Sequence, residues 1–184
     1  MDSDGSSTVV LTVTAAAWRD VLDAGDALEP LATRIVRATL ETAAITGWAK
    51  SGEVSLLLTD DRDIRSLNET YRGRDRSTNV LSFPGLDLVE GEAATARPPG
   101  PVLLGDIAIS FERLEAEAIE QGKALVDHFA HLLVHGVLHL LGYDHEDEVR
   151  ADLMEGLEAS ILKSLGFAAP YAPFADADGM SAAR

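Results

Sequence analysis

Three histidines in the second half of the chain have the residue type and spacing of a metal site. His135 and His139 are four residues apart, and His145 follows six residues later. On an α-helix, residues four apart lie on one face, so both imidazoles can reach the same cation. Gly142 can end such a helix in a sharp reversal that brings His145 back as a third ligand. The spacing therefore predicts that these three histidines bind one zinc ion.

The chemistry of such a site depends on the ligands that the chain can supply. Three imidazoles leave the fourth tetrahedral position of zinc open to water, which is typical of catalytic rather than structural sites. Zinc lowers the pKa of water to about 7 and so supports hydrolysis at neutral pH. The chain has no cysteine, which excludes thiolate ligands, cysteine nucleophiles and disulfides. The competing interpretation is a pair of ordinary helix histidines. The third histidine, after a helix-ending glycine, favours a metal-dependent hydrolase.

Four polar residues near this pattern have roles that the sequence leaves open. His131 lies one turn before the first histidine of the pair, so it can be a fourth ligand, orient a ligand or contact a substrate. For His131 and His128 alike, a packed or solvent-facing side chain is the simpler interpretation. Asp144 can orient the neighbouring histidine or form a turn, and Asp106 is ambiguous at the end of a predicted strand.

The charge balance restricts the possible partners of the chain. The sequence has 15 Lys and Arg residues against 31 Asp and Glu residues, a formal net charge of −16. Bulk attraction to nucleic acid or to an anionic membrane is therefore not expected. An RNA substrate would need a local basic patch, for which the candidates are Arg62, Arg65, Arg72, Arg74 and Arg76. Arg74 and Arg76 are expected to contact backbone phosphates without reading sequence. By its position alone, Arg72 fits a solvated arginine in a charged loop better than a functional residue.

Apolar patterning and turn residues predict the elements that position these side chains. The length of 184 residues suits one domain, which we expect at residues 9–167 between flexible ends at 1–8 and 168–184. Strands are expected at 9–13, 53–59, 79–83 and 102–109. Helices are expected from an entry at 23–30 to Gly47, then at 60–71, 110–121, 124–141 and 146–165, with a long loop at 85–101. The predicted fold class is α+β, a single domain with a mixed sheet of about four strands and a histidine-bearing helix similar to that of zinc peptidases.

The N-terminal residues and the apolar runs bear on localisation. No apolar run reaches the roughly 18 residues of a membrane span, and residues 1–7 lack the basic and apolar parts of a signal peptide. We therefore expect a cytoplasmic protein with no membrane partner.

The HxxxHxxGxxH spacing resembles that of metzincin peptidases, with one part missing. Those enzymes carry glutamate directly after the first histidine as the general base. Here that position is Gly136. A zinc peptidase is therefore a rival interpretation without a visible base.

The full string HGVLHLLGYDH, from His135 to His145, resembles much more specifically the YbeY family of bacterial rRNA maturation factors. Residues 71–73 (YRG) and 77–84 (STNVLSFP) resemble a second segment of that family, and 104–107 (LGDI) resemble one of its strands. The resemblance extends over about residues 9–166.

The resemblance implies a zinc-dependent endoribonuclease specific for single-stranded RNA. It implies a role in rRNA maturation, at the 3′ end of 16S rRNA, and in ribosome quality control, with the small ribosomal subunit and its assembly proteins as partners. It maps the zinc ligands onto His135, His139 and His145 and a functional, catalytic arginine onto Arg72. A non-catalytic, zinc-containing ribosome-assembly factor is the alternative. The oligomeric state does not follow from the sequence.

Overall fold

The computed structural model describes residues 7–22, 27–43, 47–88 and 99–171. Most of the predicted flexible ends, residues 1–6 and 172–184, lie outside the described residues. Part of the predicted loop, residues 89–98, lies outside them too. The domain bounds therefore remain a prediction.

One mixed sheet of four strands forms the base of the fold. The strands are β1 (Thr8–Val13), β2 (Glu53–Thr59), β3 (Val80–Pro84) and β4 (Leu103–Ser110). Their order is β1-β2-β4-β3, with β1, β2 and β4 parallel and the edge strand β3 antiparallel to β4. This confirms the predicted α+β class and its mixed sheet.

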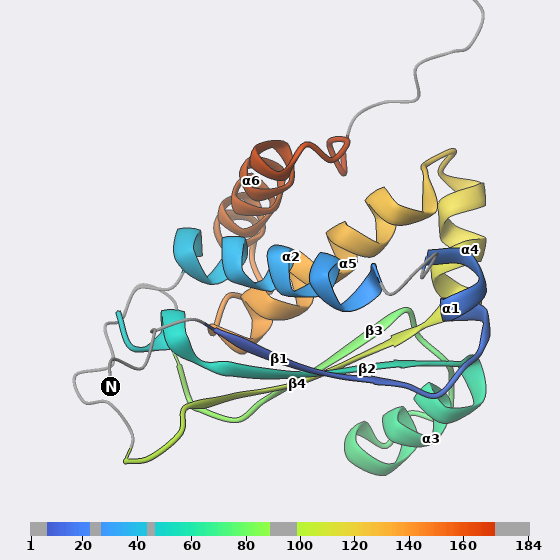
Figure 1. The fold of residues 1–184 in the computed structure, drawn as a ribbon, viewed down its shortest axis with the longest axis horizontal. Coiled ribbons are helices and arrows are strands. Elements are labelled where there is room, and N and C mark those ends of the chain that lie inside the picture. The colour runs from blue at the N-terminus through green and yellow to red at the C-terminus, as the bar shows by residue number, and fades with distance from the viewer. Residues whose placement is uncertain (1–6, 23–26, 44–46, 89–98, 172–184) are drawn as a thin grey trace, which may run out of the picture.

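Helices cover both faces of the sheet, unequally. They are α1 (Ala17–Leu22), α2 (Leu28–Ala43), α3 (Asp61–Arg72), α4 (Phe111–Glu120), α5 (Leu125–Leu140) and α6 (Glu148–Leu165), with a 3₁₀ turn at Ala49–Ser51. Figure 1 shows α2, α5 and α6 above one face of the sheet and α3 below the other. In the described part of the chain, no helix is both long and apolar enough to cross a membrane.

The sequence patterning missed α1, which tertiary contacts hold in place. The helix has six residues, too few to show a helical period. Its Trp18 side chain is fully buried, donates a hydrogen bond from Nε1 to the Thr59 carbonyl (2.9 Å) and meets the rings of Phe111 and Phe129 edge-on. All three partners are distant in sequence, so no local pattern announces the helix.

Helix α5 is the central helix, and it carries both histidines of the predicted pair. It contacts α2, α4 and α6 as well as strands β3 and β4. Its apolar side chains are buried on several sides, while His135 and His139 keep partial exposure. The core therefore fixes the rotation of α5, and that rotation decides where the two imidazoles emerge.

Gly136 lets α5 approach the sheet closely. A Cβ at this position would lie 3.1 Å from two carbons of Ile107 and 3.3 Å from Ser82 Oγ. The Ser82 hydroxyl also donates to the Gly136 carbonyl at 3.3 Å. Position 136 therefore faces the sheet, while the residue before it, His135, reaches the open side of the helix.

Position 105 in β4 requires glycine because the backbone of β3 approaches it even more closely. Its φ is +141°, and a Cβ there would lie 2.3 Å from the Phe83 carbonyl oxygen and 2.8 Å from the Gly85 nitrogen. We expect Gly105→Ala to lower the free energy of unfolding by roughly 2–4 kcal/mol, through backbone strain and displacement of β3. Denaturant unfolding at equilibrium measures this difference.

The matched control for Gly105 is Gly156, which lies on the exposed side of α6 with no neighbouring atom within 4 Å of an added Cβ. Gly156→Ala is expected to raise the free energy of unfolding by about 0.5–1 kcal/mol, because alanine suits a helix interior better. A Gly105→Ala protein as stable as the wild type would contradict the close approach between β3 and β4.

Candidate metal centre

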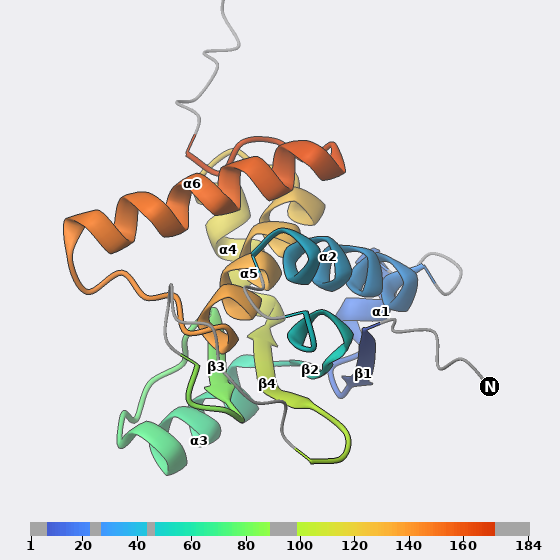
Figure 2. The same ribbon diagram turned by 90° about the vertical axis from the view of Figure 1, so that its left-hand side faces the viewer.

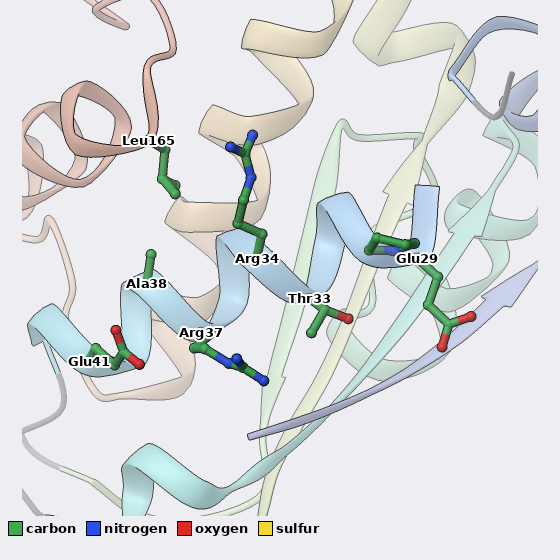
Figure 3. Close-up of a pocket in the computed structure, with 8 residues that line it drawn as sticks. Glu29, Thr33, Arg34, Arg37, Ala38, Glu41 and Leu165 are labelled. Atoms are coloured by element: carbon green, nitrogen blue, oxygen red, sulfur yellow. The ribbon is translucent and has the colours of Figure 1, made fainter. Parts of the chain in front are cut away.

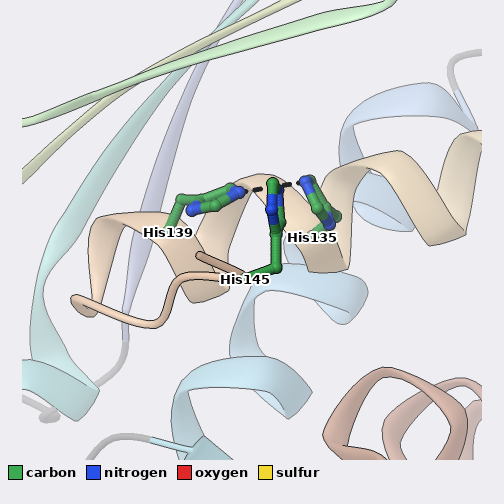
Figure 4. A group of neighbouring side chains, drawn as sticks. All are labelled: His135, His139 and His145. Carbon is green, nitrogen blue, oxygen red and sulfur yellow. Dashed lines mark hydrogen bonds between the residues drawn. The ribbon is translucent and has the colours of Figure 1, made fainter. Parts of the chain in front are cut away.

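The three predicted histidines converge on one point (Figure 4). The Nε2 atoms of His135 and His139 are 3.0 Å apart. The ring of His145 lies 5.7 Å from that of His135 and 5.2 Å from that of His139, between centroids. Each residue offers one nitrogen, and these nitrogens all lie within 4.8 Å of one another. The group can therefore hold a metal ion.

A glycine reversal after α5 delivers the third histidine, as the spacing predicts. Gly142 has a φ of +89°, and the Tyr143 amide turns back to donate to the Leu138 carbonyl at 3.1 Å. The Tyr143 hydroxyl donates to the Ala43 carbonyl at the end of α2 (3.0 Å). This buried anchor fixes the turn, so His145 approaches the α5 pair from a defined direction.

Hydrogen bonds on the far side of the rings fix which nitrogens face inward. His135 Nδ1 lies 2.7 Å from Glu158 Oε1, and His139 Nδ1 lies 2.9 Å from the Tyr143 carbonyl oxygen. A carboxylate and a carbonyl only accept, so both Nδ1 atoms carry a proton and donate it. The Nε2 atoms of the two rings are then the nitrogens left to face a metal ion. Tetrahedral zinc holds two such nitrogens roughly 3.3 Å apart, close to the observed separation of 3.0 Å, so this pair of donors fits a zinc ion.

The protonation state of His139 also suits a ligand. Burial, together with the neighbouring rings of His135 and His145, lowers the pKa of His139 to about 4. Its imidazole is therefore neutral at pH 7, which is the form that binds a metal.

Glu158 is the main residue that sequence reasoning missed. Its side chain is 1 % exposed and accepts hydrogen bonds from His135, from His131 Nε2 (3.1 Å) and from the Tyr171 hydroxyl. Burial alone would raise the pKa of Glu158, but these three hydrogen bonds lower it to about 2. The Glu158 carboxylate is thus a buried anion. It orients the candidate ligand His135 through Nδ1, on the side of the ring away from the metal centre.

A sequence signal for Glu158 existed. The residue falls in the acidic stretch 144–158, which reads as a solvated surface. However, Met154, Glu158, Ile161 and Leu162 recur at helical spacing, and all four are buried in α6. A glutamate within the apolar stripe of a helix needs a partner, and that is the clue.

The structure resolves the open roles of His131 and His128. His131 bonds to Glu158 and does not join the group of three, so it acts on the carboxylate rather than as a fourth ligand. His128 is 3 % exposed and bonds through Nε2 to Glu117 at 2.8 Å. Burial lowers the pKa of His128, so it is a packed side chain.

Neither of the two ambiguous aspartates belongs to the group. Asp144 accepts from the Glu146 amide (3.1 Å) and from Arg150 (2.7 Å), which supports its interpretation as a turn-forming residue. Asp106 and Ile107 are neighbours in β4, so their side chains point to opposite faces of the sheet. Since Ile107 contacts α5, Asp106 points to the opposite face, where it lines a depression of about 500 Å³.

Arg72 lies against the strand that borders α5. It ends α3 and donates from Nη2 to the Ser82 carbonyl at 3.0 Å, and its guanidinium lies 5.7 Å from the centre of the Phe83 ring. Ser82 in turn bonds to Gly136, next to His135. Figure 2 shows β3 between α3 and α5. Arg72 is therefore held in place rather than freely solvated.

Three of the five predicted basic residues meet in one polar pocket. Arg72, Arg74 and Arg76 line a pocket of about 530 Å³, and Arg113 from α4 joins them. The Arg113 guanidinium donates to Ser77 Oγ at 2.7 and 3.0 Å. Sequence reasoning missed Arg113 because it lies more than 30 residues further along the chain.

The other two predicted arginines lie outside the lining of that pocket. Arg65 pairs with Asp75 at 2.5 Å on the exposed side of α3, and Arg62 lies nearby on the same helix.

A separate depression of about 620 Å³ lies on α2 beside Leu165 (Figure 3). Its charged lining consists of two arginines and two glutamates along one helix: Glu29, Arg34, Arg37 and Glu41. Its lining contains no histidine, so we place the candidate site at the three histidines.

Comparison with known proteins relates most of the chain to one family. Residues 19–166 match the family model described as "Endoribonuclease YbeY". A protein of that name from Paramagnetospirillum magneticum is 53 % identical over 119 residues, 65 % of this chain and 71 % of that protein. Another from Sphingopyxis alaskensis is 48 % identical over 166 residues, 89 % of this chain and 96 % of that protein. The solution structure of TM1509 from Thermotoga maritima is 20 % identical, with a TM-score of 0.49 over 90 % of this chain and 100 % of that one.

Proposed function

The chain belongs to the endoribonuclease YbeY family, and we propose that it is a metal-dependent endoribonuclease that cleaves single-stranded RNA during rRNA maturation. The observation that carries this proposal is the convergence of three imidazoles, two of which, His135 and His139, already have their outer nitrogens hydrogen-bonded.

We assign one zinc ion to His135, His139 and His145. Neutral imidazoles suit zinc, and in the described part of the chain no fourth acidic or histidine side chain joins them. An open coordination position is expected of a catalytic site, so this favours the enzyme over an assembly factor with a structural zinc. A bound zinc supplies Lewis-acid chemistry, which polarises a phosphate oxygen and stabilises developing charge.

We assign to Arg72 the binding of the scissile phosphate. A guanidinium is planar, permanently charged and able to donate to two phosphate oxygens at once. The bond to the Ser82 carbonyl fixes its position and uses one N–H group, so others remain for substrate. Because Ser82 is also bonded to Gly136, movement of Arg72 relative to His135 is restricted.

We assign to the arginine pocket the binding of the RNA phosphates that flank the scissile phosphate. Arg74, Arg76 and Arg113 concentrate positive charge on a chain whose net charge is −16. A local cluster of this kind attracts a phosphate backbone where the global charge does not.

We expect Arg113→Gln to weaken the binding of single-stranded RNA and to reduce its salt dependence. Losing one phosphate contact should lower the slope of log K against log salt by about 0.7. Fluorescence anisotropy with a labelled oligoribonucleotide at several salt concentrations measures this slope. Arg62→Gln, on α3 outside the pocket lining, is the matched control and should keep the wild-type slope. Identical slopes for Arg113→Gln and wild type would remove Arg113 from the RNA interface.

The rival peptidase mechanism needs a glutamate at position 136 as its general base, and packing against the sheet leaves no room for one there. Position 136 faces Ile107 and Ser82 at 3.1–3.3 Å, so a glutamate there would enter the sheet rather than the metal site.

One experiment separates the candidate functions. Zinc-loaded protein is incubated with labelled single-stranded RNA, double-stranded RNA and casein, beside His135→Ala. We expect cleavage of single-stranded RNA alone and none by the variant. Casein digestion would favour the peptidase, and no cleavage by zinc-loaded wild type would favour the assembly factor.

The biological setting is proposed from family membership. We propose that the substrate is the 3′ end of 16S rRNA, handled in the cytoplasm on the small ribosomal subunit with its assembly proteins, and that the enzyme also serves ribosome quality control. Accumulation of 3′-extended 16S precursors on depletion of the protein tests this assignment.

A further inference from the structure

The segment that follows α6 is fastened along α5. Gly166, with a φ of +83°, ends α6, and the chain turns back across the start of α5. The Ala168 amide donates to Asp127 Oδ1 at 3.3 Å, and Lys123 Nζ donates to the Pro170 carbonyl. These contacts bring the next residue, Tyr171, to the side of the metal centre.

The Tyr171 side chain reaches the buried carboxylate behind the histidines. Its hydroxyl donates to Glu158 Oε2 and lies 3.5 Å from His131 Nε2. Its ring meets that of His131 edge-on, with centroids 5.5 Å apart. Burial and the bond to Glu158 raise the pKa of Tyr171 above its usual value, so the hydroxyl keeps its proton at neutral pH.

The two oxygens of Glu158 divide their partners between the histidines. Oε1 accepts from His135 Nδ1 at 2.7 Å, while Oε2 accepts from His131 and Tyr171. A carboxylate is planar and rigid, so donors that fix Oε2 also fix Oε1. The position of Oε1 then sets the orientation of the His135 ring, because Nδ1 and Nε2 belong to one plane.

We propose that Tyr171 is a positioning residue of the metal centre, whose hydroxyl holds Glu158 so that His135 directs Nε2 at the ion. The inference rests on the proposed metal site at the three histidines. It makes the segment after α6 part of that site, although none of its residues is a ligand.

Tyr171→Phe removes the hydroxyl and keeps the ring, so it tests this role directly. We expect the zinc affinity of the full chain, measured by competition with a chromophoric chelator, to fall about tenfold, at the low end of the effects of outer hydrogen-bond partners. The thermal midpoint of the metal-free protein should fall slightly, because the buried carboxylate loses one hydrogen-bond donor, so zinc affinity is compared at a temperature at which both proteins are folded. Tyr71→Phe, at a tyrosine that is 68 % exposed on α3, is the matched control and should bind zinc like the wild type.

A double-mutant cycle with Glu158→Gln tests whether Tyr171 affects zinc affinity through Glu158. If Tyr171 acts through Glu158, Tyr171→Phe should have almost no further effect on zinc affinity in that background, whereas an equal fold-loss in both backgrounds overturns the proposal. Should Glu158→Gln fail to fold, ¹⁵N NMR of the histidine rings in metal-free Tyr171→Phe takes its place. There the His135 Nδ1–H signal should weaken through faster exchange, and an unchanged signal overturns the proposal.

The same zinc-binding measurements test the metal centre and the role of Tyr171 separately. Wild-type protein that binds no zinc would refute the metal centre itself. Wild type that binds zinc while Tyr171→Phe binds it as tightly, or more tightly, would refute only the role of Tyr171.

Discussion

Replacing His139 with alanine is expected to leave a folded protein that retains almost no zinc and does not cleave RNA. The Nε2 atom of His139 lies 3.0 Å from that of His135, so the substitution removes one of two nitrogens that face each other directly. Outer hydrogen-bond partners alone change metal affinity by about 10–100-fold, so loss of a ligand should exceed a hundredfold. Zinc content after dialysis, from elemental analysis, and cleavage of labelled single-stranded RNA measure the two effects.

The control for His139 lies on the same helix. His128 is buried, bonds to Glu117 and stands outside the group of three. His128→Gln keeps a side chain that can donate to Glu117 and should retain one zinc per chain. Because alanine favours a helix, His139→Ala should preserve helical content by circular dichroism. Equal zinc in His139→Ala and wild type would refute the proposed ligand set.

The second large effect is expected at Arg72. Arg72→Ala should bind zinc and fold like the wild type, yet lose about 10²–10³-fold in kcat/KM on single-stranded RNA, as happens when one preorganised donor to a developing charge is removed. The side chain is exposed and donates a hydrogen bond to the Ser82 carbonyl, so its loss should cost about 1 kcal/mol or less in stability. Cleavage kinetics and zinc titration on the same preparation separate catalysis from metal binding.

Two further variants define what Arg72 contributes. Arg72→Lys keeps the charge but loses the planar fork, so it should recover only part of the rate. Arg65→Ala removes another arginine of α3 that is paired with Asp75 on the surface, and it should cleave like the wild type. An Arg72→Ala enzyme with the wild-type rate would show that this arginine does not contact the scissile phosphate.

The sequence by itself determined the features that depend on neighbouring residues. The helix that carries His135 and His139, and the reversal at Gly142, follow from helical periodicity and the freedom of glycine at positive φ. The same holds for β2, found at the predicted residues, and for α3, which begins within one residue of its predicted start, where the Asp60 side chain accepts from the Asp63 amide at 2.9 Å. The YbeY resemblance rested on such local strings, and the comparisons confirmed it.

Local rules were less complete where a side chain had a distant alternative partner. Ser110 is the N-cap of α4, at the predicted start of this helix, but its hydroxyl donates to Asp61 Oδ1 at 2.6 Å instead of capping the helix. A hydroxyl can satisfy only a few partners, and the folded chain brought one that the local sequence does not contain.

Only the tertiary structure decided the surroundings of the metal centre. Glu158 lies 23 residues from His135, and Tyr171 lies 13 residues beyond Glu158, yet one carboxylate joins them. Arg113 reaches the arginine pocket in the same way, from a different helix. Spacing along one helix or turn constrains only side chains a few residues apart. Which distant side chains meet is set instead by the packing of α5 and α6 on each other and by the hydrogen bonds that join α4 to the segment before β3.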